Sequence, residues 1–272
     1  MKLYRTARGA VLEKEGRFWP LDDQWDVLIN HPDLVGHLQR SSSGRGGARV
    51  DEQWLAPIAS QEVWAAGVTY LRSRSARIDE SQDAGGGTFY DRVYSAHRPE
   101  LFFKAAGWRV QGPGASVRIR RDAKWSVPEP ELALYINARA QVIGYTIGND
   151  VSSRDIEGEN PLYLPQAKCY DGACALGPCL LVSEMPLALS TPIALRIARG
   201  ASTVFDGSTT LAQMRRTPEE LVQFLFRELS FPAGVVLLTG TGVIPPDDFT
   251  LEAGDDVQIT VPPIGVLRNV VE

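Results

Sequence analysis

A series of short apolar segments, each bounded by turn residues, fills the chain after Leu101. Such segments have the length and spacing of β-strands, and repeated βαβ units would place a helical pattern between consecutive strands. The segments are Leu101–Lys104, Val117–Ile119, Glu131–Ile136, Val142–Gly148, Cys179–Val182, Ile193–Ile197, Val235–Leu238 and Val257–Val261. The sequence therefore predicts an α+β fold that is mainly β, built on an antiparallel or mixed sheet.

The beginning of the chain predicts a small α/β unit. Its expected strands are Leu3–Ala7, Ala10–Glu13 and Arg17–Leu21, and helical stretches follow Asp22 and His31. Residues 41–47 have the Gly and Ser content of a flexible connection, so we expect a boundary between residues 41 and 60. We accordingly predict two domains, residues 1–58 and 59–272.

Two further helices are expected in the larger domain. One spans Tyr70–Glu80 and precedes the Gly-rich loop Ser81–Thr88, which has the composition of a lid or of an ordinary surface loop. The other begins at Thr217 with a capping box and a proline at its first position. Its apolar stripe predicts packing on a sheet face and consists of Leu221, Phe224, Leu225 and Leu229.

The charge balance limits the classes of molecule that the protein is expected to bind. With 28 Lys and Arg against 33 Asp and Glu in 272 residues, the formal net charge is −5, which argues against nucleic-acid binding and favours a small molecule. No run has the length of a membrane span, and Met1–Gly16 lacks the apolar core of a signal peptide. We expect a cytoplasmic protein that contacts neither nucleic acid nor membrane.

Common catalytic motifs are missing from the sequence. Gly112-Pro113-Gly114 lacks the third glycine of a dinucleotide fingerprint, and none of the three histidines accompanies a nucleophile motif. The evenly spaced Cys169, Cys174 and Cys179 lack the paired spacing of a zinc site. We interpret them as reduced thiols, buried as small residues on neighbouring strands.

A predicted hairpin concentrates carboxylates. Alternation along the first strand places Glu129 and Glu131 on one face, and alternation along the second places Asp150 on the matching face. Matching the apolar faces requires paired positions that sum to an odd number, for example 279, which pairs Ile136 with Ile143. In that register Glu129 lies opposite Asp150.

Carboxylates gathered in this way require a compensating cation. All-oxygen ligands favour Mg²⁺, with Mn²⁺ or Ca²⁺ as alternatives, and Pro128 and Pro130 limit strand pairing where the site would open. A solvated acidic strand face is the other interpretation.

Several motifs in this region resemble the fumarylacetoacetate hydrolase superfamily. They occur in order from Gly67 nearly to the C-terminus. The matching pieces are Gly67–Tyr70, Leu101–Lys104, Glu129 with Glu131, Gly144–Asp155, Lys168–Gly172, Leu176–Pro178, Leu238–Gly242 and Gly265–Asn269. The resemblance implies a mixed β-sandwich roll with a small N-terminal α/β domain, a catalytic domain over residues 59–272, and homodimers or higher homo-oligomers. It also implies Mg²⁺ held by Glu129, Glu131 and Asp150, and a 2-oxo acid substrate.

One departure from the superfamily pattern bears on the reaction. Hydrolases of the superfamily commonly carry a histidine in a G-x-N-Y-x-x-H segment, and Ser73 stands at that position here. The segments Arg98–Lys104, Pro128–Leu132 and Glu159–Gln166 instead resemble 2-keto-3-deoxypentonate dehydratases, the 2-keto-3-deoxy-D-arabinonate enzymes among them. The resemblance thus implies a hydro-lyase of oxidative pentose catabolism that forms 2,5-dioxopentanoate.

The dehydratase hypothesis assigns a base and an acid. Lys168 takes a C3 proton, and Glu100 delivers a proton to the departing C4 hydroxyl; a purely ion-pairing Lys168 is the alternative. Further residues are expected to bind substrate: Thr241, Gly240, Arg154 and Tyr70. Three other functions stay open at this point. The same metal site would suit an acylpyruvate-type C–C hydrolase or an oxaloacetate decarboxylase, and a vestigial site would make the chain a 2-oxo acid binding protein.

Overall fold

The computed structural model describes residues 1–44, 46–48, 52–71 and 93–272. Most of the predicted helix Tyr70–Glu80, the whole predicted loop Ser81–Thr88 and Ser73 lie outside the described residues. No helix among the described residues is long and apolar enough to cross a membrane.

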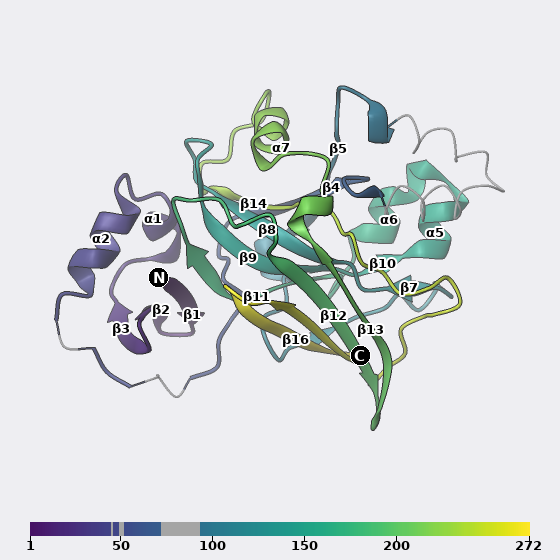
Figure 1. Cartoon of the computed structure of the whole chain (residues 1–272), viewed down its shortest axis with the longest axis horizontal. Coiled ribbons are helices and arrows are strands. Elements are labelled where there is room, and N and C mark those ends of the chain that lie inside the picture. The colour runs from purple at the N-terminus through teal and green to yellow at the C-terminus, as the bar shows by residue number, and fades with distance from the viewer. Residues whose placement is uncertain (45, 49–51, 72–92) are drawn as a thin grey trace.

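A nine-stranded sheet forms the centre of the molecule, with the strand order β3-β2-β1-β11-β9-β8-β14-β4-β5 (Figure 1). Its strands are β1 (Lys2–Thr6), β2 (Gly9–Lys14), β3 (Arg17–Leu21), β4 (Glu62–Gly67), β5 (Glu100–Ala106), β8 (Pro130–Ile136), β9 (Val142–Asp150), β11 (Cys174–Val182) and β14 (Val235–Leu238). The strands β14 and β4 pair in parallel, and the other pairs of this sheet in the described residues are antiparallel. The predicted mixed sheet is confirmed.

A second, five-stranded sheet packs on one face of the first. Its order is β13-β12-β15-β16-β6. Its strands are β6 (Ser116–Val117), β12 (Pro192–Arg199), β13 (Ser202–Thr210), β15 (Asp256–Val261) and β16 (Gly265–Val271), and a separate short ribbon joins β7 (Ser126–Val127) to β10 (Ser152–Ser153). Leu132, Leu134 and Ile147 of the large sheet share a core with Leu195 and Ile259 of the small one. The two sheets therefore form a sandwich.

The helices lie around the sandwich. Those that lie wholly within the described residues are α1 (Trp25–Ile29), α2 (Leu34–Ser41), α5 (Arg154–Glu159), α6 (Leu164–Lys168) and α7 (Pro218–Leu225), with single 3₁₀ turns η1 (Gly107–Arg109), η2 (Pro161–Tyr163) and η3 (Leu211–Gln213). Figure 1 shows α1 and α2 at one end of the molecule and α5 and α6 at the other.

The N-terminal unit covers the second face of the large sheet. Strand β1 pairs with β11, and Ala133 and Tyr135 of β8 pack in one core with Trp25 of α1. The Tyr135 hydroxyl accepts a hydrogen bond from Trp25 Nε1 at 2.8 Å and donates one to Gln61 Oε1 at 3.0 Å. The large sheet thus runs across the boundary placed at residue 58, and the division into two domains stays a prediction.

The predicted register holds along most of the hairpin. From Pro130 to Tyr135 each residue of β8 lies opposite the β9 residue that brings the sum to 279. A bulge then places Ile136 opposite Val142, so the predicted pairing with Ile143 is wrong. The bulge lies at the end remote from the carboxylates and leaves their register unchanged.

The predicted helix after Thr217 begins as expected and ends early. The Thr217 side chain accepts a hydrogen bond from the Glu220 backbone N–H, which confirms the N-cap. Glu220 itself pairs with Arg216 instead of completing the capping box. The helix ends at Leu225, so Leu229 lies beyond it and is 42% exposed.

All three cysteines are free thiols. Cys174 and Cys179 are buried, but they lie on the same strand, β11, so the predicted placement on neighbouring strands is wrong. Burial raises the pKa of each of these two thiols to about 12. Their chemistry is therefore that of small apolar residues.

We expect Cys174 and Cys179 to resist alkylation in the native protein. Each thiol has a higher pKa in the folded chain than in the unfolded one, so native protein at about pH 8 holds both as neutral thiols. The stability linked to them is present below the unfolded pKa and is lost as the pH rises toward about 12. Mass spectrometry after iodoacetamide treatment checks this, with urea-unfolded protein as the control. Rapid labelling of either residue in folded protein would contradict the assignment.

Candidate active site

Three carboxylates meet where β8 and β9 run side by side. The Glu129 and Asp150 backbones exchange hydrogen bonds of 3.2 and 3.0 Å, so the two residues lie opposite each other as the register predicts. Glu131 lies on β8 and shares the same face. Glu129, Glu131 and Asp150 expose only 5%, 2% and 0% of their surface. One carboxylate oxygen of each lies within 4.8 Å of the others, and the alternative of a solvated acidic face is excluded.

The sheet opens beside Glu131 because β14 ends there. Pairing between β8 and β14 stops at Ala133 and Leu238, and Thr239 then donates its N–H and its hydroxyl to the Leu132 carbonyl. The next residue, Gly240, has a φ of +89° and donates its N–H to Glu131 Oε2 at 2.5 Å. A Cβ at this position would lie 2.0 Å from the Thr69 hydroxyl oxygen. Only glycine allows this turn, which aims a backbone donor at Glu131.

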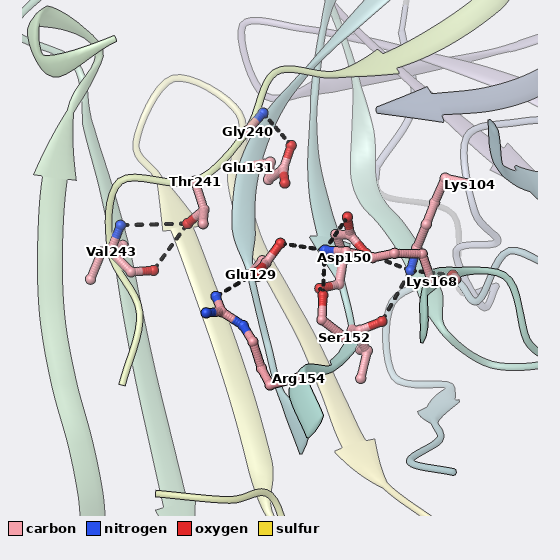
Figure 2. Close-up of polar contacts among 11 residues, drawn as sticks. Lys104, Glu129, Glu131, Asp150, Ser152, Arg154, Lys168, Gly240, Thr241 and Val243 are labelled. Carbon is pink, nitrogen blue, oxygen red and sulfur yellow. Dashed lines mark hydrogen bonds and ion pairs between the residues drawn. The ribbon is translucent and has the colours of Figure 1, made fainter. Parts of the chain in front are cut away.

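Lys168 and Arg154 approach Glu129 from opposite sides (Figure 2). The Lys168 Nζ donates to Glu129 Oε2 at 2.7 Å, to Asp150 Oδ2 at 3.1 Å and to Ser152 Oγ at 2.6 Å. The Arg154 guanidinium donates to Glu129 Oε1 at 2.6 Å. Both cations are buried, Lys168 at the end of α6 and Arg154 at the start of α5. The buried carboxylates therefore have cationic partners within the chain.

A second buried lysine belongs to this cluster, and the sequence analysis did not predict it as a site residue. Lys104 is 1% exposed, and its Nζ lies 2.5 Å from Asp150 Oδ1. The available signal was a single lysine at the end of the apolar segment Leu101–Lys104, directly before Ala105 and Ala106. Long cationic residues are rarely buried without a partner, so that position could have been recognised as a candidate ion pair.

The electrostatic surroundings separate the proton affinities of two carboxyl groups. Burial and the charges of Asp150 and Glu129 raise the pKa of Glu131 well above its usual value. Burial also acts to raise the pKa of Asp150, but Lys104 and Lys168 outweigh it, so that pKa is lowered. Glu131 is therefore the carboxyl group that holds a proton more readily than an exposed glutamate would.

The structure gives three of the four predicted substrate-binding residues internal partners, and the first of them, Arg154, pairs with Glu129. Thr241 is 3% exposed, and its hydroxyl donates to the Val243 carbonyl at 3.0 Å, while the Gly240 N–H serves Glu131. Tyr70 is buried, and burial together with the Glu131 charge raises the pKa of its hydroxyl. Thr241 and Gly240 nevertheless line a small cavity with the three carboxylates and Lys168.

Glu100 lies next to Gly67, one of the residues that line that cavity, and itself lines a neighbouring cavity. It pairs with Gly67, and a Cβ on Gly67 would lie 2.0 Å from Glu100 Oε2, so the absence of a side chain there admits the carboxyl group. Gly67 and Val68 line the cavity, and Val68 has a φ of +52°. A β-branched residue in this left-handed region is strained, and such strain is typical of functional sites.

The donor set fits a hard divalent cation. Three carboxylate oxygens from Glu129, Glu131 and Asp150 lie within reach of one ion, and oxygen ligands of this kind suit Mg²⁺. Lys168 lies next to two of the three. The arrangement can hold a metal ion beside a group capable of moving a proton.

The chain is similar to two proteins that are both named as dehydratases of 3-deoxy sugar acids. It is 44% identical over 237 residues to a probable 2-keto-3-deoxyxylonate dehydratase of Haloferax volcanii, covering 87% of this chain and 81% of that one. It is also 44% identical over 214 residues to the 2-dehydro-3-deoxy-D-arabinonate dehydratase of Saccharolobus solfataricus, covering 78% of this chain and 72% of that one.

The fold of the chain also matches that of a solved dehydratase structure. A 2-keto-3-deoxy-D-arabinonate dehydratase complexed with magnesium and 2,5-dioxopentanoate matches with a TM-score of 0.85 and 34% identity, over 100% of this chain and 99% of that one. The family model described as fumarylacetoacetate (FAA) hydrolase C-terminal matches residues 75–272. The predicted sandwich and the superfamily resemblance are thereby confirmed, and the chain belongs to the fumarylacetoacetate hydrolase family.

Proposed function

We propose that this protein is a Mg²⁺-dependent dehydratase that converts a 2-keto-3-deoxypentonate to 2,5-dioxopentanoate in oxidative pentose catabolism. The observation that carries the proposal is the buried Lys168 amine, held within 3.1 Å of two carboxylates of the metal-binding trio. The 44% identical relatives named as dehydratases support it.

Glu129, Glu131 and Asp150 would hold the metal ion. A bound Mg²⁺ would supply positive charge at the C1 carboxylate and C2 carbonyl and so make the C3 protons more acidic. The chain itself orients two of these ligands: the Gly240 N–H bonds to Glu131, and Arg154 bonds to Glu129. Mn²⁺ or Ca²⁺ would satisfy the same oxygen set.

Lys168 and Glu100 move the protons. In its neutral amine form Lys168 Nζ takes one proton from C3, the C3–H electron pair forms the C3–C4 double bond, and the C4 hydroxyl leaves as water with a proton from Glu100. The unsaturated keto alcohol then tautomerises to 2,5-dioxopentanoate. Ser152 Oγ, which donates to the Asp150 carbonyl at 3.1 Å, presents a lone pair that keeps the amine in place.

The remaining residues bind and orient the substrate. Because the Thr241 hydroxyl already donates to Val243, its contribution comes from its backbone and its remaining lone pairs. Tyr70 offers a buried hydroxyl near Glu131, and Arg154 places a positive charge beside the trio. We further propose a cytoplasmic homodimer or larger homo-oligomer, on the family resemblance and the free thiols.

The activity is tested with the purified protein and Mg²⁺. We expect 2-keto-3-deoxy-D-arabinonate or its L isomer to yield the semialdehyde product, followed by NMR. Lys168→Met should lower kcat by roughly 10²–10⁴-fold, since it removes a positioned proton acceptor. The exposed Lys124→Met is the matched control and should behave as the unmodified protein.

Three outcomes would contradict this function. Turnover of acylpyruvates or oxaloacetate in place of the sugar acid would favour the hydrolase or decarboxylase alternative. Binding of a 2-oxo acid in calorimetry without turnover would indicate a binding protein. Full dehydratase activity in Lys168→Met would remove this residue as the base.

We expect Mg²⁺ to stabilise the protein in a pH-dependent way. At one hundred times its Kd, a ligand that binds only the folded state adds about 2.7 kcal/mol to the free energy of unfolding. Because the pKa of Glu131 is raised, a proton competes with the metal, and the stabilisation should grow as the pH increases through that pKa. Differential scanning fluorimetry with and without Mg²⁺ measures the shift in Tm.

Two variants control the metal experiment. Glu131→Gln should lose most of the Mg²⁺-dependent shift and its pH dependence, whereas the exposed Glu228→Gln should keep both. An undiminished shift in Glu131→Gln, or one that does not depend on pH in the unmodified protein, would show that Glu131 is not a ligand.

A further inference from the structure

Lys104 lies on a β-bulge. Ala105 pairs with Val63 of β4, but Phe103 pairs with the very next residue, Trp64, so Lys104 between them has no partner residue in the described β4–β5 ladder. Such an extra residue bends a strand and re-aims its side chain, and bulges are frequent beside active sites. The bulge leaves Lys104 and its neighbour Ala105 both buried.

The side chain makes a contact that a flat sheet would forbid. Strand β5 is the outermost strand at its end of the sheet, and β14, β8 and β4 separate it from β9. Along a flat sheet the two strands would be roughly 19 Å apart. Yet Lys104 Nζ lies 2.5 Å from Asp150 Oδ1, and Cys169 Sγ donates to the Phe103 carbonyl at 2.9 Å. The sheet therefore rolls over the site, and Lys104 spans its interior.

The Lys104 ammonium forms one ion pair and donates two hydrogen bonds beside the reacting groups. Besides Asp150, Nζ donates to the Lys168 carbonyl at 2.6 Å and to the Val151 carbonyl at 3.0 Å (Figure 2). The Lys168 carbonyl belongs to the last residue of α6, the helix that carries the proposed base. The Val151 carbonyl belongs to the residue directly after Asp150. One cation thus links the metal-ligand strand to the helix of the proposed base.

We propose that Lys104 is a positioning residue for both groups. By occupying Asp150 Oδ1 it fixes that carboxylate with Oδ2 toward Lys168, and by binding the Lys168 carbonyl it fixes the end of α6. The inference rests on the proposed function, since it gives Asp150 and Lys168 the roles of ligand and base. Partners that orient metal ligands in this way are commonly worth 10- to 100-fold in metal affinity or activity.

The test uses the full chain and Mg²⁺ alone as the first probe. Lys104→Met keeps a long side chain but removes the charge and the donors. We expect isothermal titration calorimetry to show a Kd for Mg²⁺ roughly 10- to 100-fold higher than that of the unmodified protein. With substrate, kcat should fall over the same range while KM changes less. Lys104→Arg, which keeps charge and donors, should recover part of both losses, and Lys124→Met should change neither.

The outcomes separate positioning from mere support of the fold. A Lys104→Met protein with a native circular dichroism spectrum, a lower Tm and an unchanged Kd for Mg²⁺ would overturn the proposal. If Lys104→Met does not fold, Lys104→Gln takes its place. An unchanged Kd for Mg²⁺ in that variant would also overturn the proposal. Absence of dehydratase activity in the unmodified protein would refute the proposed function but leave the Mg²⁺ titration as a test of Asp150 placement.

Discussion

The reciprocal backbone pairing of Glu129 with Asp150 is the interaction on which the site depends. It fixes two carboxylates at matched positions of neighbouring strands, with Glu131 on the same face. Buried charges of one sign destabilise a fold unless partners are supplied, because the interior does not replace the lost hydration. This strand register therefore requires cationic partners for the carboxylates, and the chain supplies Lys168, Arg154 and Lys104. Helix α5 carries Arg154 and helix α6 carries Lys168.

The two faces of β8 explain where the site can exist. One face packs its leucines against the five-stranded sheet, and the other packs Ala133 and Tyr135 against the N-terminal helices. The carboxylates lie further along that second face, beyond the ladder that β14 forms with β8. The proline at the start of β8 has no N–H to donate, and β14 turns away at Gly240. The fold is thus closed on both sides of the hairpin except at this end.

The sequence predicts the centre of the site better than its surroundings. Parity of the apolar positions along two strands is enough to set Glu129 opposite Asp150, since a slip by one residue would expose an apolar face. Parity carries no information on bulges, so the shift at Ile136 and the re-aimed Lys104 were not foreseen. The polar strand β13 was missed for a related reason: its stability comes from pairing along β12 rather than from an apolar pattern. The roll of the sheet depends on long-range contacts that local periodicity does not encode.

The matched charges around the trio have a consequence for the kinetics of metal uptake. Among the described residues, three cationic side chains contact Glu129 and Asp150. The three carboxylates and these three cations together carry no net negative formal charge. A neutral cluster exerts little long-range attraction on an approaching cation, and electrostatic steering toward it is weak. An entering ion would compete with the Lys168 ammonium for two carboxylate oxygens, Glu129 Oε2 and Asp150 Oδ2. A bound cation would therefore share these two carboxylates with a positive charge that the chain itself provides.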